Sequence, residues 1–352
     1  MIAGFKTVLA ASPKDRRDLF LGTGLRLGTV EHNIEKDFWV CWTLDALFNG
    51  IEEGTPRLLF KGGTSLSKGF GLIARFSEDI DITVFREDIG QAASVEELEA
   101  LSGKKRNARL DNIRSACQQY VNTGLRERLG QLLQTTFEES NLSHDAGRIE
   151  SDPDDPDGQS LLLWYPTVTA DGSDYIRRAV KIEAGAKSAL DPNSPVTVKP
   201  YVSDELPGTT FSVENVRTVQ PVRSFWDKLV ILHGLRRWWE HRGELRGGGQ
   251  RVSRHYYDVY RLLESSSGEA FVANLDMGSD CVRHARMFFN RPDLDLASAA
   301  PGTFALAPHD GMVESLRNDY EAMAGMIFGD VPKFDQILES IIALEARVNP
   351  PK

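Results

Sequence analysis

The sequence is poor in cysteine. Only three cysteines occur among 352 residues, and Cys41, Cys117 and Cys281 lie far apart, without the close spacing of a metal-binding motif. The histidines at 233, 241 and 255 also lack a partner spacing for zinc. We therefore expect buried thiols in a reducing compartment and no zinc site.

Long hydrophobic runs are also missing. No segment approaches the roughly 18 consecutive apolar residues of a transmembrane helix. The first residues are apolar in patches, but Lys6 interrupts them, unlike the apolar run of a signal peptide. We therefore predict a cytoplasmic protein without a membrane segment.

Positive charge is in deficit, since the formal net charge is −10. This balance argues against a general nucleic-acid coat protein, because phosphate binding needs concentrated Lys and Arg. Two local basic clusters oppose the average, in 223–254 and in 104–128. They are either solvated helix faces or a polyanion-binding surface. Trp238 and Trp239, in the first cluster, either stack on bases or pack between helices.

Composition and periodicity predict an α+β protein. Hydrophobic residues make up 41% and charged residues 26%, as in ordinary globular proteins. Apolar spacing predicts helices at 30–47, 65–70, 110–136, 225–240, 256–264, 282–289, 314–327 and 334–348, and strands at 57–60, 79–85, 161–168 and 178–184. We expect a core domain with a mixed sheet over 1–220 and a helical C-terminal domain over 221–352.

One segment is expected to form a loop, and a second is rich in turn residues. Residues 144–159 are rich in Asp with two prolines, which predicts an exposed loop at a hairpin tip. Residues 191–200 are rich in proline and turn residues. Both segments follow the predicted helix at 110–136.

The most informative motif is a pair of carboxylates that follows a glycine turn. Asp79 and Asp81 lie two apart on a predicted strand, so they project from one face, roughly 6 to 7 Å apart along the strand. Two carboxylates in this arrangement suit one or two hard cations, Mg²⁺ or Mn²⁺. An Asp-x-Asp alone is more often a solvated acidic pair, so its context decides the interpretation.

That context is a strand, glycine turn and helix. Gly62 and Gly63 let backbone amides approach a triphosphate, and a helix that begins near Ser65 directs its positive end at the same anion. Lys61 and Thr64 flank the glycines and suit phosphate contacts. Carboxylate-held metals and a bound triphosphate together favour nucleotidyl transfer with release of pyrophosphate.

The chain resembles the AbiEii family of nucleotidyltransferase toxins, which join a polymerase-β-like nucleotidyltransferase core to a helical C-terminal domain. The resemblance covers nearly the whole chain. It rests on segments 34–39, 60–68, 75–81, 180–183, 225–229, 254–260 and 319–323, which include Phe60-Lys61-Gly62-Gly63-Thr64-Ser65 and Ser77-Glu78-Asp79-Ile80-Asp81.

The resemblance implies roles for individual residues. Asp79 and Asp81 match the metal carboxylates, and Ser77 matches a hydroxyl residue that contacts nucleotide phosphate and is phosphorylated in some relatives. Lys228 matches a lysine that binds the triphosphate, and Asp258 a later essential aspartate that orients that lysine or the base.

Two positions remain open. Many relatives have Arg-Asp where this chain has Arg254-His255, which leaves the identity of the later functional acid open. Glu183 lies where polymerase-β-like folds often place a third carboxylate, as a general base or metal ligand. The alternative role for Glu183 is structural, as an acid at the end of a strand that pairs with Lys181 or Lys187.

The function implied is transfer of a nucleotide from an NTP, with Mg²⁺, to an RNA acceptor. By the resemblance, the acceptor is the tRNA 3′ end, translation is inhibited, and a cognate antitoxin is encoded nearby. One alternative is a nucleotidyltransferase that acts on a small molecule or a protein hydroxyl. Another is a non-catalytic binding module, which the intact Asp79, Asp81 and glycines argue against.

Overall fold

The computed structural model describes residues 2–52, 54–169 and 178–349. It divides into two compact units. The first consists of Met1–Phe70, Phe76–Ala93 and Gly103–Val219, and the second of Gly71–Arg75, Ser94–Ser102 and Gln220–Lys352. The second unit thus takes two short segments from the N-terminal half of the chain.

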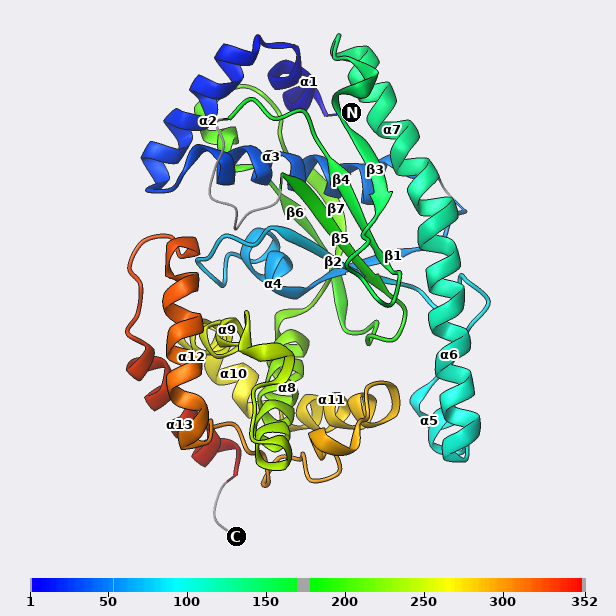
Figure 1. Ribbon diagram of the computed structural model, residues 1–352, viewed down its shortest axis with the longest axis vertical. Helices are drawn as coiled ribbons and strands as arrows, with labels where there is room; N and C mark the ends of the chain where they lie inside the picture. The colour runs from blue at the N-terminus through cyan, green and yellow to red at the C-terminus, as the bar shows by residue number, and fades with distance from the viewer. Residues whose placement is uncertain (1, 53, 170–177, 350–352) are drawn as a thin grey trace. The chain divides into compact units, whose positions relative to one another are not determined.

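The first unit is built on a seven-stranded mixed sheet (Figure 1). Its strand order is β3-β4-β5-β2-β1-β7-β6, with β2 parallel to β5, β1 parallel to β7, and the other pairs antiparallel. The strands are β1 (Leu58–Lys61), β2 (Asp79–Val84), β3 (Arg148–Ser151), β4 (Ser160–Trp164), β5 (Ala179–Gly185), β6 (Asn193–Val198) and β7 (Val213–Val219). The expected mixed sheet is therefore confirmed.

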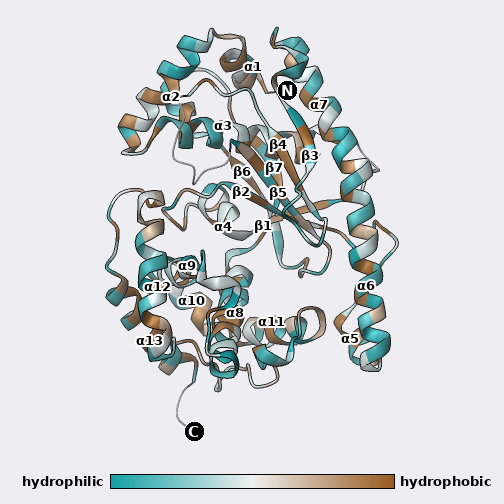
Figure 2. Ribbon diagram, viewed as in Figure 1, coloured by the Kyte–Doolittle hydropathy of each residue, from teal (hydrophilic) through white to brown (hydrophobic). Residues whose placement is uncertain are grey.

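Helices pack against this sheet. α3 contacts β2, β5 and β7, and α7 runs beside β3 (Figure 1). β1 and β4 are mainly hydrophobic, whereas α6 is mainly hydrophilic (Figure 2). The helical segments of this unit are α1 (Ala3–Ala10), α2 (Pro13–Leu27), α3 (Glu31–Asp45), η1 (Ala46–Gly50), α4 (Gly62–Thr64), η2 (Ser65–Gly69), α6 (Gly103–Tyr120), η3 (Val121–Leu125), α7 (Arg126–Glu139), η4 (His144–Ala146) and η5 (Tyr201–Glu205).

The second unit is helical. It contains α5 (Val95–Glu99), α8 (Pro221–Arg242), η6 (Arg246–Gly249), α9 (Ser253–Glu264), α10 (Gly268–Ala273), α11 (Leu275–Phe288), η7 (Pro292–Leu294), α12 (Asp310–Met323), η8 (Ala324–Met326) and α13 (Phe334–Val348). α8 begins with Pro221 in its first turn and ends at Gly243 in the left-handed conformation, two standard boundary signals. Arg283 of α11 ties α5 into this unit through ion pairs with Glu96 and Glu99.

Local patterns located β1, β2, β4, β5 and the longer helices from α3 onward, but not α1, α2 or β7, and they need two corrections. The expectation that 144–159 is an exposed loop is wrong in part, because Arg148–Ser151 forms β3 and Asp152 is only 5% exposed. The turn-rich segment 191–200 contains strand β6, where Pro195 is tolerated because β6 is an edge strand of the sheet. The segment 152–159 does connect two antiparallel strands, as expected of a hairpin tip.

Two other expectations can be checked against the fold. Cys41, Cys117 and Cys281 are all buried and unbonded to one another, as expected. Across the described residues, no helix has both the length and the apolar content needed to cross a bilayer.

Candidate nucleotidyl-transfer site

Asp79 and Asp81 begin strand β2 and share one face of the sheet. Burial alternates along the start of the strand, with Asp79 and Asp81 partly exposed and Ile80 and Ile82 fully buried. Since side chains two apart on a strand project to the same side, the apolar face anchors the strand and leaves both carboxylates on the opposite face.

The strand pairing adds Glu183 to this face. β2 and β5 run parallel with Asp81 opposite Glu183 and Asp79 opposite Lys181. Paired residues of neighbouring strands, about 4.8 Å apart, point to the same side of a sheet. Three carboxylates, of Asp79, Asp81 and Glu183, therefore lie on one face at adjacent positions.

Two lysines neutralise part of this negative charge. Lys61 of β1 lies opposite Asp81, with Nζ 3.6 Å from the Asp81 carboxylate. Lys181 Nζ lies 2.7 Å from the Glu183 carboxylate and 3.3 Å from that of Asp152. Burial alone would lower the pKa of Lys181, but the hydrogen bond and charge of Glu183 and the charge of Asp152 raise it. The sequence offered an ion pair with Lys181 as an alternative role for Glu183. This ion pair is present.

The glycine turn supports Asp81 directly. Gly62 has φ +79°, and a Cβ at this position would lie 2.0 Å from Asp81 Oδ2. The Asp81 carboxylate therefore packs on the Cα of Gly62 and occupies the space that a Cβ at position 62 would need. Only glycine fits at this position. The sequence predicted this glycine for approach to a phosphate, and the structure adds a second reason for it.

The hydroxyl residues of the motif fasten the turn to β2. Thr64 Oγ1 donates to the carbonyl oxygen of Asp79 and lies 2.7 Å from the Ser77 hydroxyl. Ser65 Oγ donates to the carbonyl oxygen of Gly62 at 2.8 Å. Thr64 and Ser65 are fully buried, whereas Ser77 is partly exposed. Ser77 is thus the most exposed of the three hydroxyl residues.

The donor set suits a hard divalent cation. Carboxylates are the ligands that Mg²⁺ prefers, and it commonly keeps only one or two of them together with water and substrate phosphates. Within the described ranges, no group of three or more His, Cys, Asp or Glu side chains is arranged to hold a metal ion. Asp79 and Asp81 as an open pair match the way Mg²⁺ is held beside a triphosphate.

Lys228 and Asp258 belong to the second unit and contact each other there. Lys228 Nζ lies 2.8 Å from Asp258 Oδ2. Arg75 completes the group by donating from Nε and Nη2 to the two oxygens of Asp258, at 2.8 and 3.0 Å. Asp258 is fully buried. Burial would raise its pKa, but the charges and hydrogen bonds of Arg75 and Lys228 hold that pKa well below its ordinary value.

Arg75 is a partner that the sequence analysis did not identify. It lies between the buried Ile73 and Phe76 and is itself 5% exposed, so an arginine in an apolar surrounding was the available signal. Ile327 forms an isolated antiparallel bridge with Arg75, which incorporates this segment into the helical unit.

Lys228 donates a hydrogen bond to Asp258 and not to His255. Burial and the positive charges of Lys228 and Arg254 hold the pKa of His255 well below its ordinary value. Asp258 is the acid that bonds Lys228.

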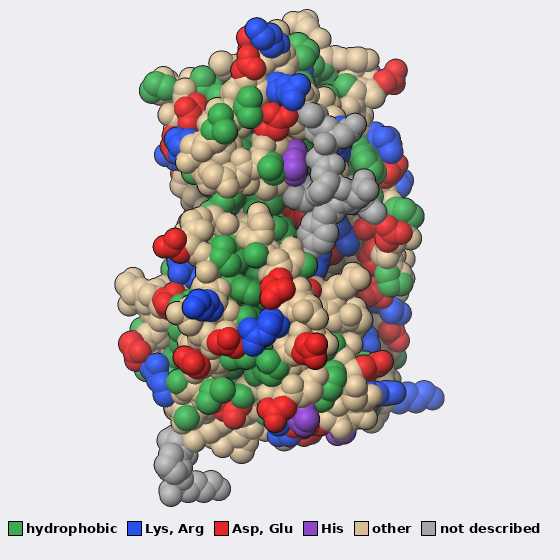
Figure 3. Space-filling model, turned by 60° about the vertical axis from the view of Figure 1, so that its left-hand side comes forward, with side chains coloured by type: hydrophobic (Ala, Val, Ile, Leu, Met, Phe, Trp, Pro, Cys, Tyr) green, Lys and Arg blue, Asp and Glu red, His purple; other side chains and the backbone are tan. Residues whose placement is uncertain are grey.

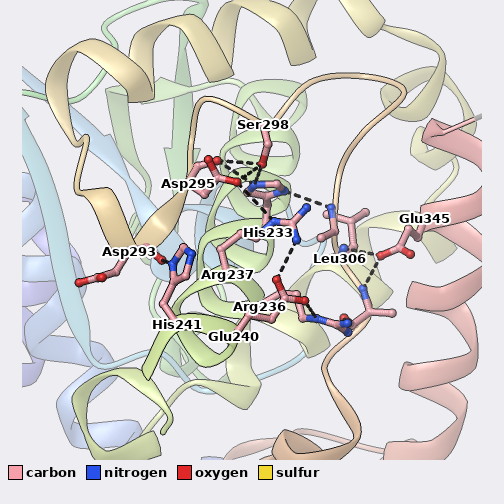
Figure 4. Close-up of polar contacts among 12 residues, drawn as sticks. His233, Arg236, Arg237, Glu240, His241, Asp293, Asp295, Ser298, Leu306 and Glu345 are labelled. Carbon is pink, nitrogen blue, oxygen red and sulfur yellow. Dashed lines mark hydrogen bonds and ion pairs between the residues drawn. The ribbon is translucent and has the colours of Figure 1, made fainter. Parts of the chain in front are cut away.

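Arg236 and Arg237 of α8 are engaged with Glu240, and Arg236 also with a backbone oxygen (Figure 4). Arg236 Nε lies 2.6 Å from Glu240 and its Nη1 donates to the carbonyl oxygen of Ala307. Arg237 pairs with Glu240 at 2.7 Å and with Asp295 at 3.8 Å. Arg242 pairs with Asp293 at 2.6 Å. The basic cluster predicted in this segment is thus largely neutralised within its own unit.

Both tryptophans of this segment are partly buried. Trp239 stacks on His309, with ring centroids 6.3 Å apart. The cationic groups of Arg242 and Arg246 lie over the ring of Trp238, 5.6 and 5.8 Å from its centroid. Protein groups therefore already occupy faces that a base would need.

Comparison with known proteins places these features in a family. A search of curated proteins found no match. Among solved structures, MenT4, a nucleotidyltransferase toxin from Mycobacterium tuberculosis H37Rv, is 15% identical, with a TM-score of 0.46 over 96% of this chain and 90% of that one. The family described as nucleotidyl transferase AbiEii toxin, type IV TA system, matches residues 45–340. Because this match spans most of the chain and contains Asp79, Asp81, Glu183, Lys228 and Asp258, the protein belongs to the AbiEii family and is a nucleotidyltransferase.

Proposed function

We propose that this enzyme binds an NTP with Mg²⁺ at Asp79 and Asp81 and transfers its nucleotide to the 3′ end of tRNA, which blocks translation. The observation that carries the proposal is the common face of Asp79, Asp81 and Glu183 on neighbouring strands. The family match supports a toxin. The tRNA acceptor rests on the resemblance of the motifs to the family.

The residues of the sheet suit each part of the transfer. Asp79 and Asp81 hold the divalent cation, which when bound offsets the charge of the triphosphate and of the departing pyrophosphate. Glu183 is placed to accept the proton of the acceptor hydroxyl. The hydroxyl oxygen bonds to the α-phosphorus while the bond from that phosphorus to the bridging oxygen breaks, and pyrophosphate leaves.

Binding of the triphosphate is assigned to the glycine turn and Lys61 of the first unit. Lys61, Gly62, Gly63, Thr64 and Ser65 span the end of β1 and the turn that follows it. Ser77, which is partly exposed and lies two residues before β2, suits a phosphate contact. Lys228 remains a proposed phosphate ligand. Its support is that Asp258 orients the ammonium group, at 2.8 Å.

The proposed biological setting is the cytoplasm, with a cognate antitoxin encoded nearby. Membership of a family of type IV toxin–antitoxin systems supports the antitoxin. Three buried, unbonded cysteines are compatible with a reducing compartment.

A second acceptor class is a small molecule or a protein hydroxyl. It is favoured by the ion pairing of Arg236, Arg237 and Arg242, which removes the free positive charge expected of an RNA-binding helix. The test is to incubate the enzyme with Mg²⁺ and each labelled NTP in turn, with either total tRNA or lysate protein. Label on tRNA supports the first acceptor, and label confined to protein or to small molecules supports the second.

The metal assignment is tested by Asp79→Asn and Asp81→Asn. Each substitution removes one cation ligand with little change in volume, so we expect both to abolish transfer in the labelling assay. Thermal midpoints without metal should hold or rise, because one of two neighbouring like charges is lost. The rise in thermal midpoint on adding Mg²⁺ and NTP should also disappear. Activity retained in either variant contradicts the assignment.

A further inference from the structure

Helix α3 carries three consecutive charged residues, Glu35, Lys36 and Asp37, that are all buried. Their exposed fractions are 1%, 2% and 3%. Burying three charges on one helix is costly unless each has a partner. Each of them has one, and the three partners come from different segments of the first unit.

Lys36 is bound to the segment that precedes β2. Its Nζ lies 2.6 Å from Oε2 of Glu78, which is 5% exposed. Glu78 stands between Ser77 and Asp79 in the chain. A fixed Glu78 side chain therefore restricts the backbone that delivers Asp79 to the face of the sheet.

Asp37 is bound to the helical segment that follows the glycine turn. Lys68 Nζ lies 2.7 Å from Asp37 Oδ1 and 3.6 Å from the centroid of the Tyr201 ring. The backbone N–H of Tyr201 donates to the second oxygen of Asp37 at 2.7 Å. Lys68 lies in η2, which continues from Gly62–Thr64, so Asp37 fixes the far end of the segment whose first residue supports Asp81.

Glu35 has a different partner. Its carboxylate accepts hydrogen bonds from the hydroxyls of Thr167 and Thr169 and from the backbone N–H of Val168, at 2.5 to 2.7 Å. These residues follow β4 and lie outside both the glycine turn and the segment before β2. Glu35 therefore provides an internal comparison, equally buried on the same helix.

We propose that Lys36 and Asp37 are positioning residues of the transfer site. Lys36 acts through Glu78 on Asp79, and Asp37 acts through Lys68 on the glycine turn that supports Asp81. One rigid helix thereby fixes the two segments that must hold the cation and the triphosphate in register. This inference rests on the proposed role of Asp79 and Asp81 and assigns neither Lys36 nor Asp37 a contact with substrate.

The test replaces each ion pair by neutral side chains so that no buried charge is left alone. The variants are Lys36→Met with Glu78→Gln, and Asp37→Asn with Lys68→Met. Because small displacements at a transfer site lower rates strongly, we expect kcat to fall on the order of 10- to 100-fold in each. Binding of Mn²⁺ with an α,β-methylene triphosphate, measured by calorimetry for each of the four bases, should weaken by about tenfold or more, since the binding groups are no longer held in place.

A second readout separates positioning from a general structural role. The single changes Lys36→Met and Glu78→Gln, assayed with the double variant, should give strongly non-additive losses in kcat, because both remove the same constraint. Glu35→Gln should lower the thermal midpoint but keep kcat within about twofold of the wild type. All rates are measured well below the thermal midpoint of each variant and corrected for the folded fraction.

Every outcome of these experiments either supports or overturns the proposal. Wild-type kcat and Mn²⁺ affinity in folded Lys36→Met/Glu78→Gln overturn the proposal for Lys36, and the same result in Asp37→Asn/Lys68→Met overturns it for Asp37. An equal loss of kcat in Glu35→Gln also overturns the proposal. If a double variant does not fold, Glu78→Asp or Lys68→Arg, which keep the charge and change the reach, takes its place under the same criteria. Activity retained in Asp79→Asn instead shows that the proposed function itself has failed.

Discussion

The single residue on which the geometry of the site depends most closely is Gly62. Its positive φ is open to glycine at little cost, and its missing Cβ leaves room for the Asp81 carboxylate. Gly62 therefore combines a backbone requirement with a steric one. The backbone requirement and the steric requirement can be tested separately, because other glycines of the first unit have a positive φ but no atom close to an added Cβ.

Gly62→Ala should impair both stability and activity. A left-handed φ costs a non-glycine residue about 1 to 2 kcal/mol, and the added Cβ displaces the Asp81 carboxylate from its position. We expect a lower thermal midpoint and loss of transfer in the labelling assay.

Gly90→Ala is the matched control for this change. Gly90 has φ +70° and nothing within 4 Å of an added Cβ. It should lose similar stability and keep full activity per folded molecule. If Gly62→Ala transfers nucleotide as well as Gly90→Ala does, the contact with Asp81 has no functional weight.

At the scale of elements, local patterns predicted the strand that carries the carboxylates. Alternation along Asp79–Val84 determined which residues share a face. The same reasoning missed β6, an edge strand concealed by Pro195 and turn residues, and the internal strand β7, whose burial pattern does not alternate strictly. Local sequence patterns reveal the hydrophobic periodicity of an element and the residue types of a turn. An edge strand that contains a proline fits neither pattern.

Contacts between distant segments were beyond such reasoning. Lys36 and Glu78 are 42 positions apart, and Arg75 and Asp258 are 183 apart. A charged residue in an apolar surrounding signals that a partner exists, but only the fold identifies it. The sequence therefore supplied the chemistry of the candidate site, and tertiary structure supplied the groups that hold it.

Elements of the helical unit are joined by the Arg75, Lys228 and Asp258 group, and this joint should depend on pH. The folded pKa of Asp258 lies below its unfolded value, near 3.9 for an ordinary aspartate. Its stabilising contribution is therefore complete above the unfolded pKa and is lost as pH falls through the folded pKa.

Asp258→Asn should destabilise the protein by about 3 to 5 kcal/mol at pH 7, because two buried cations lose their partner. The difference in thermal midpoint between wild type and variant should shrink as the pH is lowered from 5 towards the acid limit of folding, a range that calorimetry covers. Glu264→Gln, which breaks the exposed pair with Arg261 on the same helix, should cost about 1 kcal/mol or less. A difference for Asp258→Asn that stays constant with pH would contradict the ionised state of Asp258.

At the scale of the whole molecule, acidic charge predominates and much of the positive charge is paired. The net charge is −10, and acidic and basic side chains are interspersed on the face shown in Figure 3. In the first unit, Arg114 of α6 also pairs with Asp111 and Asp157, at 3.2 and 3.7 Å. Lys104 and Lys105, near the start of α6, are by contrast exposed.

Because the arginines of α8 are paired, we expect the exposed Lys104 and Lys105, rather than those arginines, to bind an RNA acceptor. Each neutralised phosphate releases counterions, so affinity for tRNA should fall steeply with salt if exposed cations contact the backbone. Replacing Lys104 and Lys105 with Gln should flatten the slope of log affinity against log salt by about one unit per lost phosphate contact. The measurement is a filter-binding titration of total tRNA at several salt concentrations.

The matched comparison replaces Arg236, Arg237 and Arg242 with Gln. These arginines are held by Glu240, Asp293 and Asp295, so their loss should lower the thermal midpoint and leave the salt slope nearly unchanged. A flattened slope in this triple variant, with a normal slope in the Lys104 and Lys105 variant, would restore α8 as the RNA-binding surface. An unaltered slope in both, together with label on protein or small molecules, would favour the non-RNA acceptor, because an acceptor that contacts few phosphates releases few counterions.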